Sequence, residues 1–341
     1  MEETYGVEET YDFKGTRKHF SRLGLWFFVG TIIIYAVQIV VEIIFLIFRL
    51  DLPEDVNINI ILSAVPMYLI GMPALIALVN MVPGQKPEKR SMKVWHFIVA
   101  VIMSFAIMYI FNIVGTMITD IIGGIKGGEV ENVLESALSG ASIPLVFVYT
   151  VICAPIMEEY VFRKLIVDRT VRYGQGVAVL LSGLMFGLFH GNLNQFAYTF
   201  CLGMFLAFIY VKTGNLKITI GLHMLVNIMG GVVGMVILEI LDLDALTAIM
   251  ESGADSTALY AFAVENIGGL LMLLAYEFLV YGSMLVGGIL LIVALVRKQF
   301  QLAPGEEPIP RGARFRTVIL NPGMLLYCLI WVALIIWQLF M

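Results

Sequence analysis

Charged residues are scarce in this sequence. Only 14% of the 341 residues are Asp, Glu, Lys or Arg, whereas 60% are hydrophobic, and the mean hydropathy is +0.92. Soluble proteins seldom reach so large a hydrophobic fraction, so the composition argues against a soluble enzyme. Cysteine is rarer still. Cys153, Cys201 and Cys328 lie far apart inside apolar segments, which excludes a disulfide framework or a zinc ribbon.

Hydrophobic runs recur along the whole chain. A helix needs roughly 20 apolar residues to cross a bilayer, and the runs predict an all-α, polytopic bundle of about nine transmembrane helices in a cell membrane. The first 23 residues are polar and the first apolar run is too long for a signal peptide, so we expect none. The segments are roughly 24–48, 57–82, 94–123, 143–168, 174–190, 195–211, 218–240, 266–296 and 319–340.

Basic and acidic residues alternate between successive loops. Basic residues precede segment 1 and follow segments 2, 4, 6 and 8, whereas the other loops are mainly acidic, with Lys126 as a basic exception. Because cytoplasmic loops carry an excess of Lys and Arg, we expect a cytoplasmic N-terminus and, after nine spans, an external C-terminus. The acidic loop residues are Asp51, Glu54, Asp55, Glu129, Glu131, Glu135, Asp242, Asp244, Glu251 and Asp255.

The stretch EEYVFR at residues 158–163 places charge beside an almost wholly apolar run. On a helix Glu159 and Arg163 are four residues apart with the acid first, which favours an ion pair. Glu158 lies about 100° further round the helix and cannot share that partner equally. Ionisable groups at membrane depth are costly and usually functional. The alternative is that all three lie in the cytoplasmic headgroup layer.

Two further stretches combine histidine with apolar helices. MFGLFHGNLNQ places Phe186 and His190 one turn apart at the end of the fifth segment, and GLHMLVNIMGG places His223 and Asn227 on one face of the seventh. A single histidine in a helix is more often a packed residue than a ligand. Two histidines, an asparagine and an unpaired Glu158 on three nearby helices predict one shared site.

These residues fit two kinds of hydrolytic chemistry. Glu158, His190 and His223 are a ligand set suited to Zn²⁺ or another divalent metal, which makes its bound water a nucleophile. Alternatively, Glu158 acts as a general base on water without a metal, while His223 and Asn227 donate hydrogen bonds to the oxyanion. The three motifs contain no serine or cysteine, so neither scheme uses a covalent nucleophile, and HExxH is absent from the chain.

EEYVFR, FGLFH and HMLVN, in this order, resemble the motifs of the CAAX protease and bacteriocin-processing family, also called Abi. The family consists of intramembrane endopeptidases, usually described as metallopeptidases, although water activation by glutamate has also been proposed. The resemblance implies that Glu158 is the catalytic carboxylate, with Glu159 and Arg163 as its structural neighbours and Phe186 as a supporting residue. His190, His223 and Asn227 match the remaining motif positions. The implied substrate is a membrane-associated CAAX-type prenylated protein, a bacteriocin or a signalling peptide precursor.

The resemblance divides the chain into three parts. We predict an N-terminal tail with helices 1–3 in residues 1–139, a catalytic core of helices 4–7 in 140–240, and a peripheral loop with helices 8 and 9 in 241–341. Two other functions stay open: a non-catalytic scaffold or immunity protein, and a transporter that uses buried Glu42 and Glu277. We expect lipid around the bundle and no nucleic-acid partner.

Overall fold

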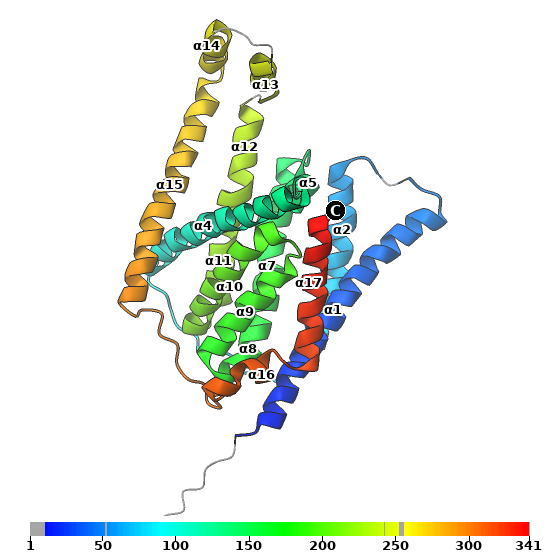
Figure 1. Cartoon of the computed structure of the whole chain (residues 1–341), viewed down its shortest axis with the longest axis vertical. Helices are drawn as coiled ribbons and strands as arrows, with labels where there is room; N and C mark the ends of the chain where they lie inside the picture. Colours follow the sequence, from blue (N-terminus) through cyan, green and yellow to red (C-terminus); the bar gives the residue numbers. More distant parts are fainter. Residues whose placement is uncertain (1–10, 52, 242, 252–255, 341) are drawn as a thin grey trace, which may run out of the picture.

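The protein is a helical bundle with eight helices long and apolar enough to span a membrane (Figure 1). The computed structural model describes residues 11–51, 53–241, 243–251 and 256–340. No strand occurs in these described ranges, and α9 (Gln175–Phe189) is a ninth, shorter apolar helix. The predicted polytopic all-α fold is thus confirmed. Asp242 and Asp255 of the predicted acidic loops lie outside the described residues.

Several spans are composed of consecutive helical pieces. Their bounds are α1 Phe13–Ile47; α2 Val56–Pro66, η1 Met67–Gly71 and α3 Met72–Asn80; α4 Val94–Lys126; α5 Val133–Leu138; α6 Ile143–Val146, η2 Phe147–Cys153, α7 Ala154–Glu158, η3 Glu159–Leu165, α8 Ile166–Thr170 and η4 Val171–Tyr173; α10 Leu193–Thr213; α11 Leu216–Asn227, η5 Ile228–Val232 and α12 Val233–Ile240; α13 Leu243–Glu251; α14 Ser256–Glu265; α15 Ile267–Val296; η6 Arg311–Ala313; α16 Arg314–Val318; and α17 Pro322–Phe340.

The fourth span changes repeatedly between α-helical and π-helical geometry. The π-helical segments η2 and η3 flank the short α7, which has Pro155 in its first turn. Proline has no backbone N–H, so carbonyl groups in the preceding turn lose a helical partner. Single π-helical turns inside α-helices are frequent at functional sites. Here they surround the two adjacent glutamates of the first motif.

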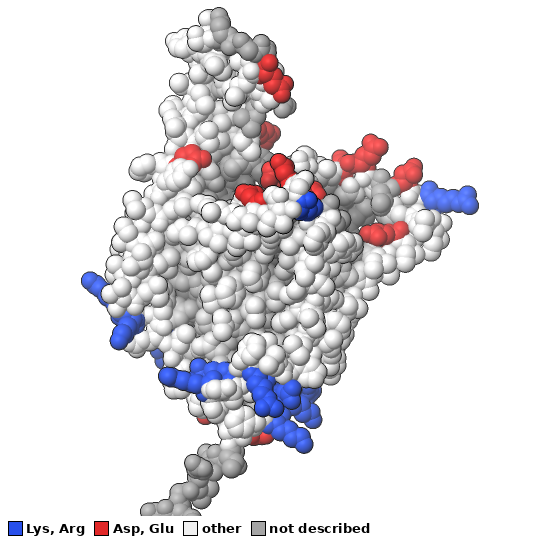
Figure 2. Space-filling view, in the orientation of Figure 1, with Lys and Arg blue, Asp and Glu red and all other residues white. Residues whose placement is uncertain are grey.

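Charged residues collect at the two ends of the bundle. In Figure 2 most Lys and Arg side chains lie at the end where α1 begins, most Asp and Glu side chains at the other, and a broad uncharged band separates them. Arg49, just after α1, is a basic residue in a mainly acidic loop, as Lys126 is in another. This separation agrees with the loop alternation in the sequence.

The largest hydrophobic core joins α1, η3, α9 and α17. Phe27, Phe162, Phe186, Tyr327 and Trp331 are all buried in it. The sequence pattern places the C-terminal helix at the periphery. In the structure, however, the Tyr327 hydroxyl donates a 2.7 Å hydrogen bond to the Met185 carbonyl of α9. The helix is therefore part of the core, because its aromatic residues fill the space between α1 and α9.

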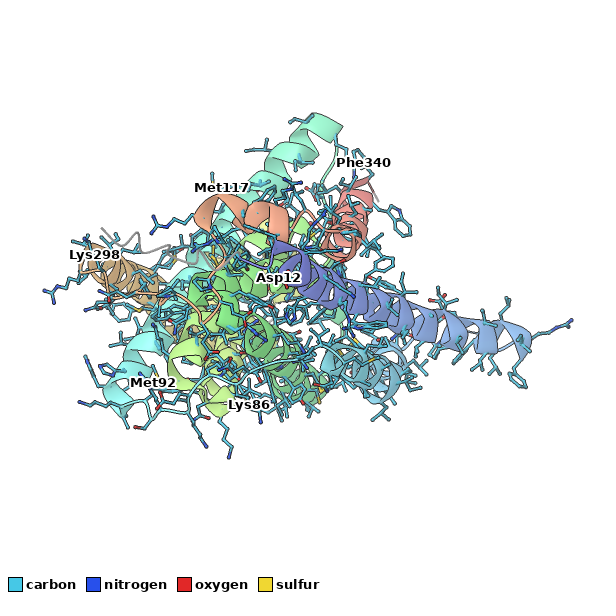
Figure 3. The ribbon with its side chains drawn as sticks, turned by 90° about the horizontal axis from the view of Figure 1, so that it is seen from below. Asp12, Lys86, Met92, Met117, Lys298 and Phe340 are labelled. Atoms are coloured by element: carbon cyan, nitrogen blue, oxygen red, sulfur yellow. The ribbon has the colours of Figure 1, made fainter. Side chains whose placement is uncertain are left out.

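Three other long helices pack one on another, starting from α9. α10 packs against α9 and α4, and α15 packs against α4. Figures 1 and 3 both show α1 running obliquely out of the bundle, so that its last turns lie apart. Apolar side chains such as Ile47, which is 68% exposed, cover that end. In a membrane this surface contacts lipid.

Candidate active site

Glu159 and Arg163 form a fully buried ion pair within η3. The Glu159 Oε1 and Arg163 Nη2 atoms are 2.8 Å apart, and neither side chain is exposed. The spacing-based expectation of a pair is therefore met. The Arg163 guanidinium also lies 4.2 Å from the centre of the Phe186 ring, a cation–π contact with α9. The pair thus joins the first motif to the second.

Glu158 has different surroundings from its neighbour. Its side chain is 17% exposed and borders a cavity, and its Oε2 lies 3.6 Å from His223 Nε2. This distance is too long for a hydrogen bond. Glu158 therefore remains available to a molecule inside the cavity.

His223 on α11 is held in one orientation by Glu159. Its Nδ1 lies 2.9 Å from Glu159 Oε1, and its ring is buried. A carboxylate paired with Arg163 is a hydrogen-bond acceptor, so Nδ1 carries the proton. The Nε2 atom, which in the neutral ring bears the lone pair, is then directed toward Glu158. Carboxylates that orient histidines in this way are common at catalytic and metal sites.

His190 directly follows α9 and is fixed by the end of that helix. Its Nδ1 is 2.9 Å from the Phe186 carbonyl oxygen, one of the last four carbonyls of α9, which lack the usual helical partners. A carbonyl can only accept, so Nδ1 again carries the proton and Nε2 bears the lone pair. His190 therefore presents an acceptor to the cavity.

Phe186 connects the histidines of the second and third motifs. Its ring centre is 4.8 Å from that of His190 and 5.8 Å from that of His223, with both contacts edge to face. These two distances limit the separation of the imidazole centres to about 10.6 Å. The structure thus brings the residues of the three motifs together, as the shared-site hypothesis requires, although their catalytic roles stay predictions.

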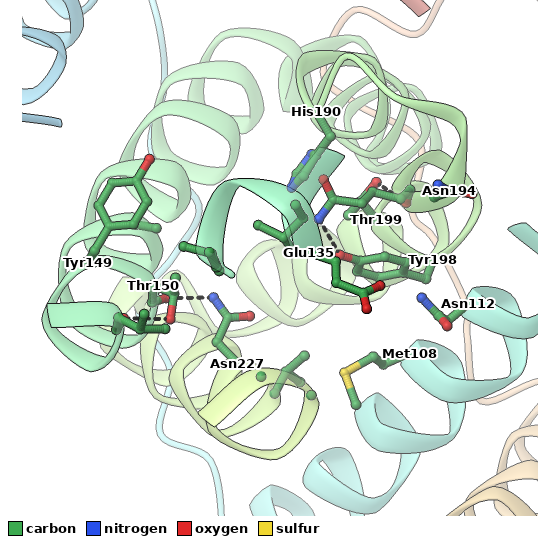
Figure 4. Close-up of a pocket in the computed structure, with 18 of the residues that line it drawn as sticks. Met108, Asn112, Glu135, Tyr149, Thr150, His190, Asn194, Tyr198, Thr199 and Asn227 are labelled. Carbon is green, nitrogen blue, oxygen red and sulfur yellow. Dashed lines mark hydrogen bonds between the residues drawn. The ribbon is translucent and has the colours of Figure 1, made fainter. Parts of the chain in front are cut away.

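Asn227 ties α11 to the broken fourth span. Its Nδ2 donates a 2.7 Å hydrogen bond to the Thr150 carbonyl in η2. In π-helical geometry that carbonyl would accept from the residue five positions later, which is Pro155 and has no N–H. Asn227 thus supplies the missing donor. Its amide has a second N–H, which stays available to the cavity that Asn227 borders (Figure 4).

The cavity that these side chains share has a volume of about 820 Å³. In Figure 4 Thr150 and Asn227 lie across it from Asn194 and Tyr198. Several polar residues that line the cavity lie outside the three motifs, and the motifs did not predict them. Glu135 comes from α5, Asn112 from α4, Tyr149 from η2, and Asn194, Gln195 and Tyr198 from α10. The only signal for the α10 group was the polar stretch NLNQ directly after His190.

The family model described as "Type II CAAX prenyl endopeptidase Rce1-like" matches residues 140–229, which include all three motifs. This segment is thus similar to CAAX prenyl endopeptidases. The resemblance stated from the motifs is thereby confirmed for helices α6 to α11.

Two curated relatives each match about a third of the chain. The membrane-embedded CAAX protease MroQ of Staphylococcus aureus (strain USA300) is 29% identical over 134 residues, which cover 37% of this chain and 53% of that protein. The putative membrane peptidase YdiL of Bacillus subtilis (strain 168) is 30% identical over 105 residues, 30% of this chain and 42% of that protein. The chain thus spans about half the length of the curated relatives it matches, and no solved structure matches it.

The predicted metal ligands in this segment agree with zinc in chemistry but not in placement. Glu158 offers a carboxylate, and His190 and His223 offer Nε2 lone pairs. Among the described residues, however, no three His, Cys, Asp or Glu side chains are close enough to hold one ion. Metal binding by Glu158, His190 and His223 therefore stays a prediction.

The two carboxylates expected of a transporter lie away from this site. Glu42 on α1 is exposed, and Glu277 on α15 is partly exposed. Neither borders the cavity, and Figure 1 shows their helices on opposite sides of the bundle. In the described part of the chain, Glu42 and Glu277 therefore lie outside the cavity that holds the three motifs.

Proposed function

We propose that the chain is an intramembrane endopeptidase that hydrolyses a peptide bond of a membrane-associated substrate. One observation carries the proposal. The Glu158 carboxylate and the Nε2 atoms of His190 and His223 border a single cavity inside an apolar helical bundle. The cavity, about 820 Å³, is large enough to hold several residues of an extended peptide. The family assignment of residues 140–229 supports the same chemistry.

Glu158 is the general base of the proposed reaction. It removes a proton from a water molecule while the water oxygen attacks the carbonyl carbon of the scissile peptide bond. The C–N bond then breaks as the proton passes to the departing nitrogen. The products are a carboxylic acid and an amine. Because the Glu158 carboxylate forms no hydrogen bond with any described residue, its oxygens are free to accept from the water.

His223 and Asn227 stabilise the charges that develop. The second N–H of the Asn227 amide can donate to the oxyanion of the tetrahedral intermediate. When His223 gains a proton at Nε2, the imidazolium lies between the carboxylates of Glu158 and Glu159. The Glu159–Arg163 pair fixes this histidine and takes no direct part in the bond changes.

We propose that the basic end of the bundle faces the cytoplasm, with the N-terminus on that side. The sorting of charges in Figure 2 supports this orientation through the positive-inside rule. The substrate is a CAAX-type prenylated protein, a bacteriocin or a signalling peptide precursor. All three reach the cavity from the bilayer or its surface.

The test compares membrane peptides from cells that express the wild-type chain with those from cells that express Glu158→Gln. The substitution keeps the side-chain shape and removes the base. Glu42→Gln, which neutralises an exposed acid on α1, is the matched control. We expect peptides that depend on the wild type to vanish with Glu158→Gln and persist with Glu42→Gln. Identical peptide sets from the wild type and Glu158→Gln would reject the peptidase.

A peptide found in this way is then synthesised in internally quenched form and incubated with purified protein. A farnesylated CAAX peptide and its unprenylated form serve as further probes. Cleavage of the farnesylated form alone would assign the prenylated class. The same variants distinguish the peptidase from a transporter. A transporter that uses Glu42 would lose its function with Glu42→Gln and keep it with Glu158→Gln.

A further inference from the structure

A chain of hydrogen bonds runs from the backbone carbonyl of His190, just after α9, to the Tyr198 hydroxyl at the cavity. Asn192 precedes the first residue of α10, and its Nδ2 lies 3.0 Å from the His190 carbonyl and 2.6 Å from Gln195 Oε1. Gln195 Nε2 lies 2.8 Å from the Tyr198 hydroxyl. Residues 195 and 198 are one turn apart on α10, so both side chains lie on the same face.

The direction of every bond in this chain follows from its backbone partners. The Gln195 backbone N–H can only donate, so the Asn192 atom that it contacts at 2.8 Å is Oδ1. The other Asn192 atom is then the amide nitrogen, which agrees with its contact to the His190 carbonyl, because a carbonyl can only accept. This nitrogen donates, so the Gln195 atom that it contacts is the oxygen. The Gln195 nitrogen therefore faces Tyr198 and donates to its hydroxyl.

This assignment leaves the proton of the Tyr198 hydroxyl without a protein acceptor. The hydroxyl oxygen accepts from Gln195, and none of the described residues accepts a hydrogen bond from it. Tyr198 and His190 border the same cavity (Figure 4), and Glu158 lines it too. Glu158 and His190 present acceptors to the cavity. A bound peptide also brings carbonyl oxygens, which need donors.

We propose that Tyr198 is a substrate-binding residue whose hydroxyl donates a hydrogen bond to a carbonyl oxygen of the peptide in the cavity. Gln195 and Asn192 are positioning residues that keep this hydroxyl directed into the cavity. The assignment rests on the proposed peptidase function. It adds a donor on α10, outside the three motifs, to the donor that Asn227 supplies from α11.

Tyr198→Phe tests the proposal, because it removes the hydroxyl and keeps the ring. A neutral hydrogen bond contributes roughly 0.5–1.5 kcal/mol, so we expect kcat/KM on the internally quenched peptide to fall by about twofold to twelvefold. Tyr109→Phe is the matched control. Tyr109 also borders the cavity, but its hydroxyl donates to the Met229 carbonyl, which Tyr276 also contacts at 3.0 Å. We expect this control to stay within about twofold of the wild type and both melting temperatures to stay unchanged.

Gln195→Met separates positioning from simple packing. It keeps the side-chain length but cannot donate to Tyr198, so we expect a severalfold loss of kcat/KM in the wild-type background. In the Tyr198→Phe background the same change should have no further effect, since the hydroxyl is already absent. Equal losses in both backgrounds would overturn the positioning role.

Two other results would overturn the role of Tyr198 itself. One is a Tyr198→Phe enzyme with wild-type kcat/KM, and the other is an equal loss in Tyr109→Phe. Both require a wild type that cleaves the peptide and a Glu158→Gln variant that does not. A wild type without cleavage would instead reject the proposed peptidase, so the two failures are distinguishable.

Discussion

Replacing Arg163 by alanine removes the cation that neutralises the buried Glu159 carboxylate. The two side chains are fully buried and 2.8 Å apart, and Glu159 also accepts from the Nδ1–H of His223 at 2.9 Å. Without Arg163 the carboxylate would remain in an apolar bundle without a neutralising cation. We therefore expect Arg163→Ala to lower the free energy of unfolding as well as the activity.

The distance between the charges sets the size of the effect. Two unit charges 2.8 Å apart attract by about 6 kcal/mol at an effective dielectric constant of about 20. The cost of taking both groups out of water offsets part of this attraction, and removing one partner of a buried pair typically costs about 3–5 kcal/mol. The remaining bond from His223 favours the lower end. We expect a loss of about 3 kcal/mol.

The assay is thermal unfolding of the purified protein in detergent, with cleavage measured on the same samples. At about 2–4 °C per kcal/mol, Arg163→Ala should lower the melting temperature by about 6–12 °C. Glu158→Gln removes a charge from the same helical turn, but its side chain faces the cavity, so we expect lost cleavage and a shift below about 2 °C. Glu159→Gln combined with Arg163→Met leaves no unpaired charge and should recover at least half of the loss.

Two results would refute this reasoning. The first is an Arg163→Ala protein that melts within about 2 °C of the wild type, which would mean that water reaches Glu159 and screens it. The second is a Glu158→Gln protein that loses as much stability as Arg163→Ala. That outcome would show that Glu158 also holds the fold together.

Three further outcomes are expected. Chelator treatment should leave the cleavage rate unchanged if Glu158 activates water alone; a rate that is lost and then restored by Zn²⁺, with metal content measured in parallel, would support the metal set of Glu158, His190 and His223. Asn227→Ala should reduce the unfolding free energy by about 1–3 kcal/mol, because the Thr150 carbonyl loses its donor; an unchanged melting temperature would contradict this. Phe186→Ala should cost about 3–5 kcal/mol by emptying a buried ring position, and a fully stable variant would show that the three motifs hold together without it.

The positions of the helices were largely predictable because membrane spans are long and apolar. The helix ends were less so. The first apolar run begins near residue 24, yet α1 begins at Phe13, with the Asp12 side chain accepting from the Gly15 backbone N–H. The first turns are polar and carry Lys14 and Arg17, so hydropathy alone cannot detect them. The role of α17 in the core was missed for a related reason: hydropathy identifies a span but not its neighbours.

Within the site, local pairs were predictable and distant ones were not. Glu159 and Arg163 are four residues apart, and helical spacing alone predicts their contact. His223 meets Glu159 across 64 residues, and Asn227 meets Thr150 across 77. Motif order indicates that such residues share a site. Which nitrogen meets which oxygen depends on the packing of separate helices.

The same helix, α11, contacts both the broken fourth span and the candidate site. An unpaired carbonyl inside a bilayer costs several kcal/mol, so a helix interrupted by Pro155 needs a donor from the protein. Asn227 is that donor, and His223 lies one turn before it on α11. The two side chains hold α11 against η2 and η3 at two points, Thr150 and Glu159. The contact that repairs the helix therefore also fixes the height at which His223 faces the cavity. Pro155, three residues before the first motif, thus gains a function that its position in the sequence did not reveal.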